Sequence, residues 1–103
     1  MKRPVKWSRA ALDDLKTQVA YIAAENPAAA QRVADGLRAA ALALSDIPTG
    51  RPGRLVDTYE KSVPRLPYII AYTITAAGVE EAIAIVRVIH TARDWPAGQW
   101  PKA

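Results

Sequence analysis

The sequence lacks several residue types that particular chemistries require. Among its 103 residues there is no cysteine, no phenylalanine and a single histidine. Disulfides, thiolate metal sites and cysteine nucleophiles are therefore excluded, and one histidine falls short of the roughly three or four ligands of a zinc site. No apolar run approaches the roughly 20 residues of a membrane-spanning helix, and residues 1–7 lack the apolar stretch of a signal peptide. We expect a cytoplasmic protein with no metal and no cofactor.

The composition that remains is typical of one small globular domain. Hydrophobic residues make up 50% of the chain, and many of them are alanines. About 100 residues is a common size for one domain and leaves no room for two, so we expect a single domain over residues 1–103. The net charge is +4, and each half of the chain carries seven basic and five acidic residues. This even distribution predicts only mild attraction to phosphates or acidic proteins.

The first part of the chain has helical periodicity. Residues 3–7 fit a short strand that can pair with a later one, and Ser8 is a typical helix N-cap. Apolar residues then repeat at steps of three and four, which predicts an amphipathic helix over residues 9–24. These apolar residues are Leu12, Leu15, Val19 and Ile22.

A second helix is expected to begin at Asn26 and Pro27. Asparagine accepts hydrogen bonds from free helical amides, and proline at the first helical position has no amide to satisfy. The helix is expected to continue to Pro48, and the short connection makes the two helices an antiparallel hairpin. Its apolar stripe consists of Val33, Leu37, Ala40, Leu44 and Ile47.

The second half of the chain has the period of two that is typical of strands. We expect a Gly/Pro/Arg loop at 50–54, strands at 56–63, 68–75 and 82–90, and a turn at 76–78. The strand at 82–90 is almost entirely apolar, as in a strand that is buried on both faces. The fold class is therefore α+β, in the order β-α-α-β-β-β, with a helical hairpin packed on a small, predominantly antiparallel sheet.

Two polar residues in the last strand are candidates for a site. His90 could act in acid–base chemistry, which needs a partner and a pocket that the sequence does not supply; its other interpretation is a structural residue. Arg87 interrupts an apolar strand, so it either marks an open groove that a partner fills or pairs with an internal acid such as Glu60. Strict alternation places Arg87 in a row with Ile83, Ile85 and Ile89, which would form an exposed apolar patch unless something covers it.

Two other features could contact phosphates or bases. The arginines of the 50–54 loop, Arg51 and Arg54, could bind phosphate, but the loop lacks the Walker-type spacing and no helix follows it. A turn with solvated arginines is the alternative. Trp95 and Trp100 are flanked by prolines and could stack on bases, although no basic run accompanies them.

Taken together, short motifs in this chain resemble the ParE branch of the RelE/ParE toxin superfamily over nearly the whole length. They are Trp7-Ser8, Tyr21-Ile22, NPAAA at 26–30, GRPGR at 50–54, PYIIAY at 67–72 and VRVIHTARDWP at 86–96. The resemblance implies the toxin of a bacterial type II toxin–antitoxin pair, which a ParD-like ribbon–helix–helix antitoxin holds inactive and through which it meets DNA indirectly. ParE relatives poison DNA gyrase, whereas RelE relatives cut messenger RNA on the ribosome.

The residues of the middle strands favour the gyrase branch. RelE-like ribonucleases carry an arginine immediately after the tyrosine that corresponds to Tyr68, where this chain has Ile69, and lysines where it has Glu60 and Ser62. Without these cations, most of the electrostatic stabilisation of RNA cleavage is missing. We therefore expect a non-enzymatic gyrase poison with no catalytic residue. The alternatives are a ribosome-dependent endoribonuclease that uses His90, and a non-toxic relic that only binds its antitoxin.

The resemblance and the strand pattern together predict two sets of contact residues. The antitoxin is expected to lie along the first helix and the last strand, and the gyrase target on the loop arginines and the end of the last strand. The expected antitoxin-binding residues are Leu12, Leu15, Val19, Arg65, Ile83, Ile85, Arg87, Ile89 and Arg93. The expected target-binding residues are Arg51, Arg54, His90 and Trp95.

Overall fold

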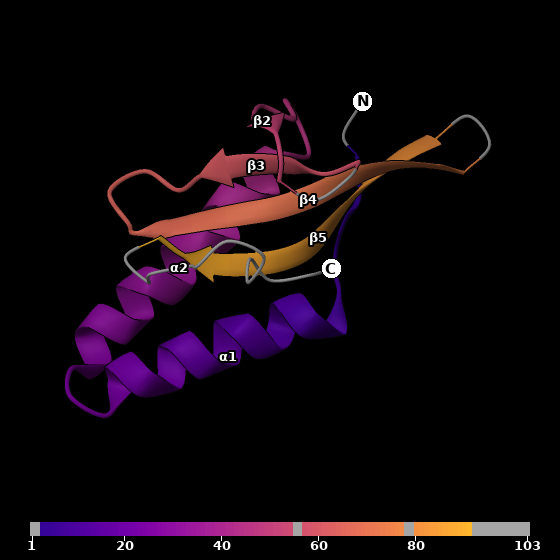
Figure 1. Ribbon diagram of the computed structural model, residues 1–103. Coiled ribbons are helices and arrows are strands. Elements are labelled where there is room, and N and C mark those ends of the chain that lie inside the picture. The colour runs from indigo at the N-terminus through magenta and orange to yellow at the C-terminus, as the bar shows by residue number, and fades with distance from the viewer. Residues whose placement is uncertain (1–2, 55–56, 78–79, 92–103) are drawn as a thin grey trace.

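The computed structural model describes residues 3–54, 57–77 and 80–91, and Figure 1 shows their arrangement. Two helices lie against one face of a five-stranded sheet, and the hairpin of the last two strands projects beyond the rest of the sheet. The elements are β1 (Val5–Trp7), α1 (Arg9–Ala23), α2 (Pro27–Ala43), β2 (Arg51–Pro52), β3 (Tyr59–Ser62), β4 (Tyr68–Ala77) and β5 (Glu80–His90). The predicted α+β class and the order of its main elements are confirmed.

Both predicted helix caps are present. The Ser8 side chain accepts a hydrogen bond from the Ala11 amide at 3.0 Å, and Asn26 accepts one from Ala29 at 3.1 Å. Each cap satisfies an amide that the first helical turn leaves without a partner. The second helix is shorter than predicted, because it ends at Ala43 rather than near Pro48. Ile47 therefore lies outside the apolar stripe and is 67% exposed.

The sheet has the strand order β1-β5-β4-β3-β2, in which only the β1–β5 pair is parallel. One element was not predicted, since β2 lies in the 50–54 segment that was expected to be a loop. The strand predicted at 56–63 begins at Tyr59. β4 extends into the predicted turn as far as Ala77, and β5 begins at Glu80, two residues before the predicted start of the last strand. Residues 55–56 and 78–79 lie outside the described residues.

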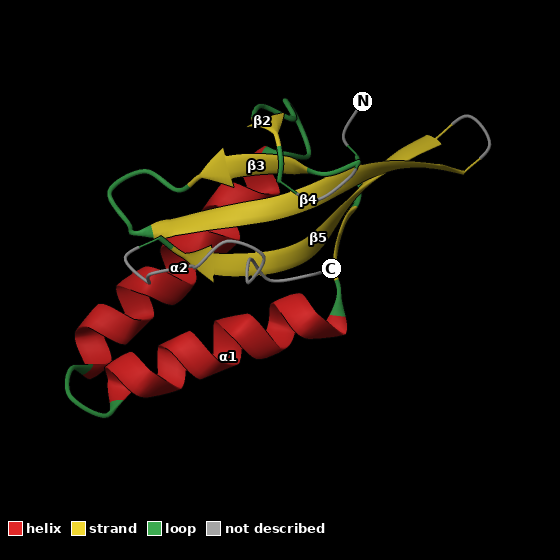
Figure 2. Cartoon of the chain, viewed as in Figure 1, coloured by secondary structure: helices red, strands yellow, loops and turns green. Residues whose placement is uncertain are grey.

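The core lies between the sheet and the two helices (Figure 2). Gly36 of α2 allows a close approach here, since a Cβ atom at this position would lie 2.7 Å from Leu66 Cδ1 in the β3–β4 turn. The buried cluster comprises Ala11, Leu15, Val33, Leu37, Ala41 and Leu44 from the helical half, and Val63, Tyr68, Ile70, Tyr72, Ile83, Ile85 and Val88 from the sheet half. This core fixes how the helices present their outer faces.

Candidate functional site

Arg87 is held by an acid of α1. Its Nε and Nη2 atoms each donate to the Asp14 carboxylate at 2.8 Å, and the same carboxylate accepts the backbone N–H of Val88 at 2.9 Å. Asp14 thus covers the edge of β5 just past its pairing with β1. The sequence offered two interpretations of Arg87, and one was an ion pair with an internal acid such as Glu60. The structure has such an ion pair, and its acid is Asp14. Arg87 is therefore not the cation of an open groove.

The apolar row expected around Arg87 is not exposed. Strict alternation fails because the pairing of β4 with β5 shifts between Ala71 and Tyr72, which leaves Val86 as an extra residue. The two isoleucines before the bulge consequently share the helix-packed face with Val88 rather than with Arg87. Exposed fractions are 0%, 0% and 1% for Ile83, Ile85 and Ile89. The prediction of an exposed row was wrong, and these side chains are not available to a partner on this surface.

A hollow of about 380 Å³ is lined by residues of β1, α1 and α2. We call it the α1–α2 groove; its lining residues are Trp7, Leu12, Leu15, Lys16, Val19 and Arg38. Leu12 is 36% exposed although it is apolar, and no acidic side chain of the described residues lines the groove. An apolar floor with two cations at its rim suits an apolar segment that carries carboxylates.

The α1–α2 groove brings together three of the residues predicted to bind the antitoxin, namely Leu12, Leu15 and Val19. Sequence reasoning missed Trp7, Lys16 and Arg38. For Lys16 a signal existed, since it lies four residues after Leu12 on the same side of the helix. Arg38 reaches the groove from α2 and could be found only from the packing of the two helices.

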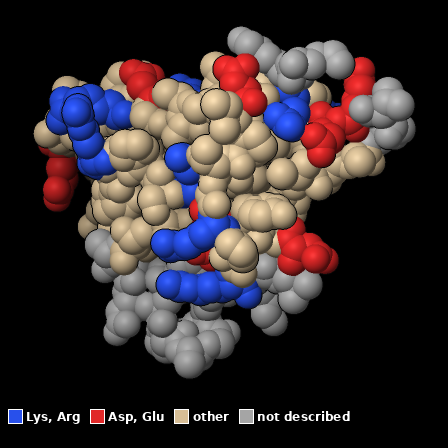
Figure 3. Space-filling model, turned by 90° about the horizontal axis from the view of Figure 1, so that it is seen from above, with Lys and Arg blue, Asp and Glu red and all other residues tan. Residues whose placement is uncertain are grey.

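The predicted loop arginines surround a buried carboxylate. Glu60 is 4% exposed, its Oε1 lies 3.6 Å from Arg51 Nη2, and its Oε2 accepts the backbone N–H of Arg54 at 2.9 Å. Lys61 donates to the Thr49 hydroxyl at 2.8 Å. Figure 3, seen from above the sheet, shows basic side chains spread over this face rather than joined in one patch. The Arg51 side chain and the Arg54 amide thus already have a negatively charged partner within the protein, the Glu60 carboxylate.

His90 is packed against an aromatic ring of the core. Its ring lies edge-on to Tyr68 with centroids 5.0 Å apart, and the Tyr68 hydroxyl donates to Gln18 Oε1 of α1 at 3.3 Å. Burial raises the pKa of Tyr68 above its ordinary value of 10.0. These contacts favour the structural interpretation of His90.

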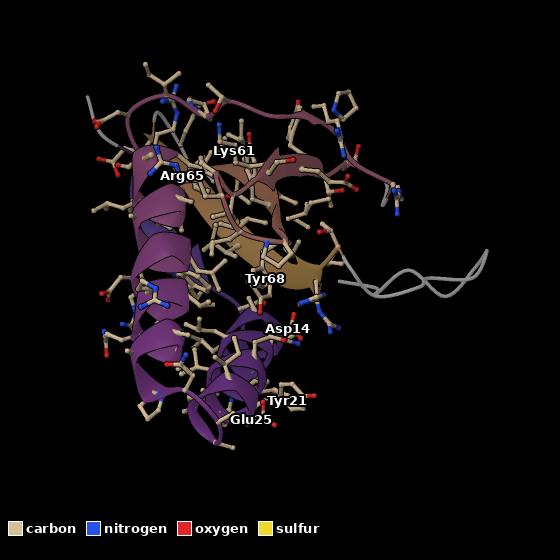
Figure 4. All side chains as sticks on the ribbon, turned by 90° about the vertical axis from the view of Figure 1, so that its left-hand side faces the viewer. Asp14, Tyr21, Glu25, Lys61, Arg65 and Tyr68 are labelled. Carbon is tan, nitrogen blue, oxygen red and sulfur yellow. The ribbon has the colours of Figure 1, made fainter. Side chains whose placement is uncertain are left out.

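The remaining predicted residues lie elsewhere. Arg65 has a left-handed φ of 65° in the turn between β3 and β4, and Figure 4 places it beside α2, well separated from Asp14 on α1. Arg93 and Trp95 lie outside the described residues. Among the residues that the structure describes, no three potential metal ligands gather, and no helix is long and apolar enough to cross a membrane.

Comparison with known proteins identifies the family. Residues 5–95 match the family model described as the ParE toxin of the type II toxin–antitoxin system parDE. The chain belongs to the ParE toxin family. This agrees with the resemblance that the sequence motifs indicated.

Two bacterial toxins are similar to this chain over most of their length. The "Putative toxin Y4kP" of Sinorhizobium fredii is 35% identical over 92% of this chain and 95% of its own. "Toxin RelE2" of Caulobacter vibrioides is 38% identical over 86% of this chain and 96% of its own.

Solved structures share the fold at lower identity. A chain of the chromosomal ParDE system from P. aeruginosa has a TM-score of 0.76 at 18% identity, over 86% of this chain and 96% of that one. The YoeB/ParE toxin from Agrobacterium tumefaciens has a TM-score of 0.51 at 11% identity, over 84% and 97%. This ParE-family fold therefore tolerates wide sequence change.

Proposed function

We propose that this ParE-family toxin acts by binding DNA gyrase and trapping it with its DNA cleaved, so that gyrase supplies the chemistry. One observation carries the proposal: the sheet positions where RelE-like ribonucleases carry cations are occupied by the buried Glu60 and Ile69, which are 4% and 6% exposed. Metal-free RNA cleavage develops negative charge on the phosphate, and a fixed carboxylate opposes it.

The histidine adds little to a ribonuclease mechanism. A general acid or base must reach the proton that it transfers. His90 instead packs edge-on against Tyr68, a residue of the buried core. Arg51, Arg54 and the end of β5, together with Trp95, remain the proposed contacts to gyrase.

A second candidate function is ribosome-dependent cleavage of messenger RNA. It is favoured by the 38% identity to the protein named RelE2. The third interpretation, a non-toxic relic that only binds its antitoxin, predicts no effect on growth at all.

One pair of assays separates these functions. The purified chain is incubated with gyrase, ATP and supercoiled plasmid, and in parallel with a ribosome complex on a defined transcript. We expect linear plasmid after detergent and protease treatment, and an intact transcript. Cuts in the A-site codon that disappear in His90→Ala would establish the ribonuclease function, and absence of both activities together with normal growth would leave the relic.

The partner that restrains the toxin is proposed to be a ParD-like ribbon–helix–helix antitoxin, which provides any contact to DNA. Its apolar, acidic tail is proposed to fill the α1–α2 groove, where Leu12, Leu15 and Val19 offer apolar surface and Lys16 and Arg38 attract carboxylates. Arg65 and Arg93 stay proposed contacts to the antitoxin. The buried β5 isoleucines and Arg87 are no longer part of this surface.

A further inference from the structure

The outer edge of β4 is left open for half its length. β4 runs from Tyr68 to Ala77, but β3 pairs only with its residues 69–72. Before β3 the chain turns at Asp57, where φ is 61°, and in the described part of the chain no strand continues beside residues 73–77. Figure 1 shows this part of β4 in the hairpin that projects from the sheet.

The hydrogen-bonding alternation shows which backbone groups face this edge. The Val63 amide donates to the Tyr68 carbonyl at 3.0 Å, so Tyr68 and every second residue after it direct their backbone groups toward the β3 side. By this alternation the N–H and C=O groups of Ile74 and Ala76 point to the open edge. Ile74 and Ala76 are two positions apart in the sequence, which is the repeat of a β-strand and therefore the spacing that an added strand requires.

A hollow of about 620 Å³ adjoins the open edge at the point where β3 begins. Pro52, Thr58, Tyr59 and Ile74 are among its lining residues. Tyr59 is 40% exposed and is held by stacking on Tyr72, with ring centroids 5.6 Å apart. An extended chain paired with β4 could therefore place one apolar side chain between Tyr59 and Ile74.

The two edges of the sheet around the β4–β5 hairpin differ in their protection. On the β5 side, Glu80 and Glu81 carry charge, Arg3 pairs with Glu81 at 3.1 Å, and Asp14 accepts the Val88 amide. On the β4 side, residues 73–77 read Thr-Ile-Thr-Ala-Ala, with no charge and no proline. Natural edge strands are normally blunted by such residues, and an unblunted edge is a template for another strand.

We propose that residues 73–77 of β4 accept an extended, uncharged segment of the protein that the toxin inhibits, which adds a strand to the sheet. Peptide backbone is the group that matches a row of alternating N–H and C=O groups. Nucleic acid would need several cations along the edge, whereas residues 73–77 carry none and the charges of Arg54 and Asp57 in the adjoining hollow balance each other. The inference rests on the proposed function as a toxin that binds a target protein.

The test uses full-length chain carrying Ala76→Pro, which removes one outward N–H group at an edge position where proline is tolerated. Ala76→Ser is the matched control, because it changes the side chain and keeps the donor. Thr75→Lys is a second variant that keeps every backbone donor and adds an edge charge. The measurements are growth arrest on expression, inhibition of purified gyrase, and amide exchange at Ile74 and Ala76 with gyrase present; antitoxin binding and thermal unfolding report folding.

We expect Ala76→Pro and Thr75→Lys to lose at least about tenfold in growth arrest and gyrase inhibition, with Ala76→Ser like the parent and both edge amides protected in the complex. Growth arrest by both edge variants at the level of the parent would overturn the inference, as would lost activity with unprotected amides. If Ala76→Pro fails to bind antitoxin, its fold is damaged, and the toxicity of Thr75→Lys then tests the inference. If the parent arrests growth but does not inhibit gyrase, gyrase is refuted as the target, and the growth arrest of the two edge variants still tests whether the target pairs with β4. If the parent is not toxic, both the proposed function and this inference are overturned.

Discussion

The α1–α2 groove and the open edge of β4 offer two different kinds of recognition. The groove presents side chains, with an apolar floor of Leu12, Leu15 and Val19 and two cations at its rim. The β4 edge presents backbone groups over residues 73–77, with one aromatic side chain beside it. Side-chain pockets discriminate strongly between partners, whereas backbone pairing tolerates many sequences. A toxin built this way can be selective for its antitoxin and permissive toward its target.

This comparison predicts that a substitution in one surface leaves the other surface functional. A substitution in the core that supports both surfaces should impair both. Leu37 is fully buried in the core, and Leu15 is 7% exposed. Replacing either by alanine should lower the free energy of unfolding by about 2–5 kcal/mol, from lost apolar burial and the cavity that remains. Chemical denaturation of the purified chain measures this. An unchanged midpoint would contradict the packing of the helices on the sheet.

The groove alone should be damaged by Leu12→Asp. Leu12 is 36% exposed on the groove floor, so a carboxylate there meets an acidic, apolar partner with both the wrong polarity and the wrong charge. We expect antitoxin affinity to fall by about 100-fold, equivalent to roughly 2.7 kcal/mol. Titration calorimetry gives the affinity.

The matched control for that change is Leu42→Asp on α2. Leu42 is 67% exposed and does not line the groove. It should bind antitoxin like the parent, and both variants should remain toxic because the β4 edge is intact. Equal losses in the two variants would show that the antitoxin does not use the groove.

Asp14 connects α1 to β5 and does not line the groove. Asp14→Ala would leave the Arg87 guanidinium and the Val88 amide without this acceptor, so we expect a loss of about 2 kcal/mol in stability. This figure is below that for a fully buried pair, because the two side chains are 26% and 16% exposed. Thermal unfolding is the measurement, with the neighbouring Asp13→Ala as the control. Equal stability of the two variants would mean that the ion pair contributes nothing.

Local signals made the helical half of the molecule predictable from sequence. Ser8 and Asn26 cap their helices through side-chain contacts within three residues, so the information lies in adjacent positions. The apolar period likewise gave the three apolar groove residues on α1 and missed Lys16. Ile47 was misplaced because the apolar period continues beyond Ala43, where the α-helix ends and a turn follows.

The sheet half depends on contacts between distant residues. The bulge at Val86 reassigns faces along β5, and only the register with Ala71 and Tyr72 reveals it. The Arg87 partner lies 73 residues away on α1. The open β4 edge likewise follows from where β3 starts, which the alternating pattern placed three residues too early. Long-range pairing therefore accounts for most of what sequence reasoning missed.

Of the changes considered, alkaline pH should have the smallest effect on stability, and it should act both near the helices and near the β4 edge. Tyr68 lies under the helices and Tyr72 lies under Tyr59 beside the β4 edge; burial raises the pKa of both phenols above 10.0, and for Tyr72 the charge of Tyr59 adds to this. Because the folded pKa is raised, the protonated phenols favour the folded state below pH 10, and this stability is lost as pH rises through the folded pKa values. We expect unfolding midpoints that are flat from neutral pH to about 9 and fall above 10.

Tyr72→Phe also loses the 2.8 Å hydrogen bond to the Thr49 carbonyl, so it should be less stable at neutral pH and its stability should be less sensitive to pH above 10. Ultraviolet titration of the phenols checks the assignment, and ionisation of all tyrosines at the ordinary pKa in the folded chain would contradict it.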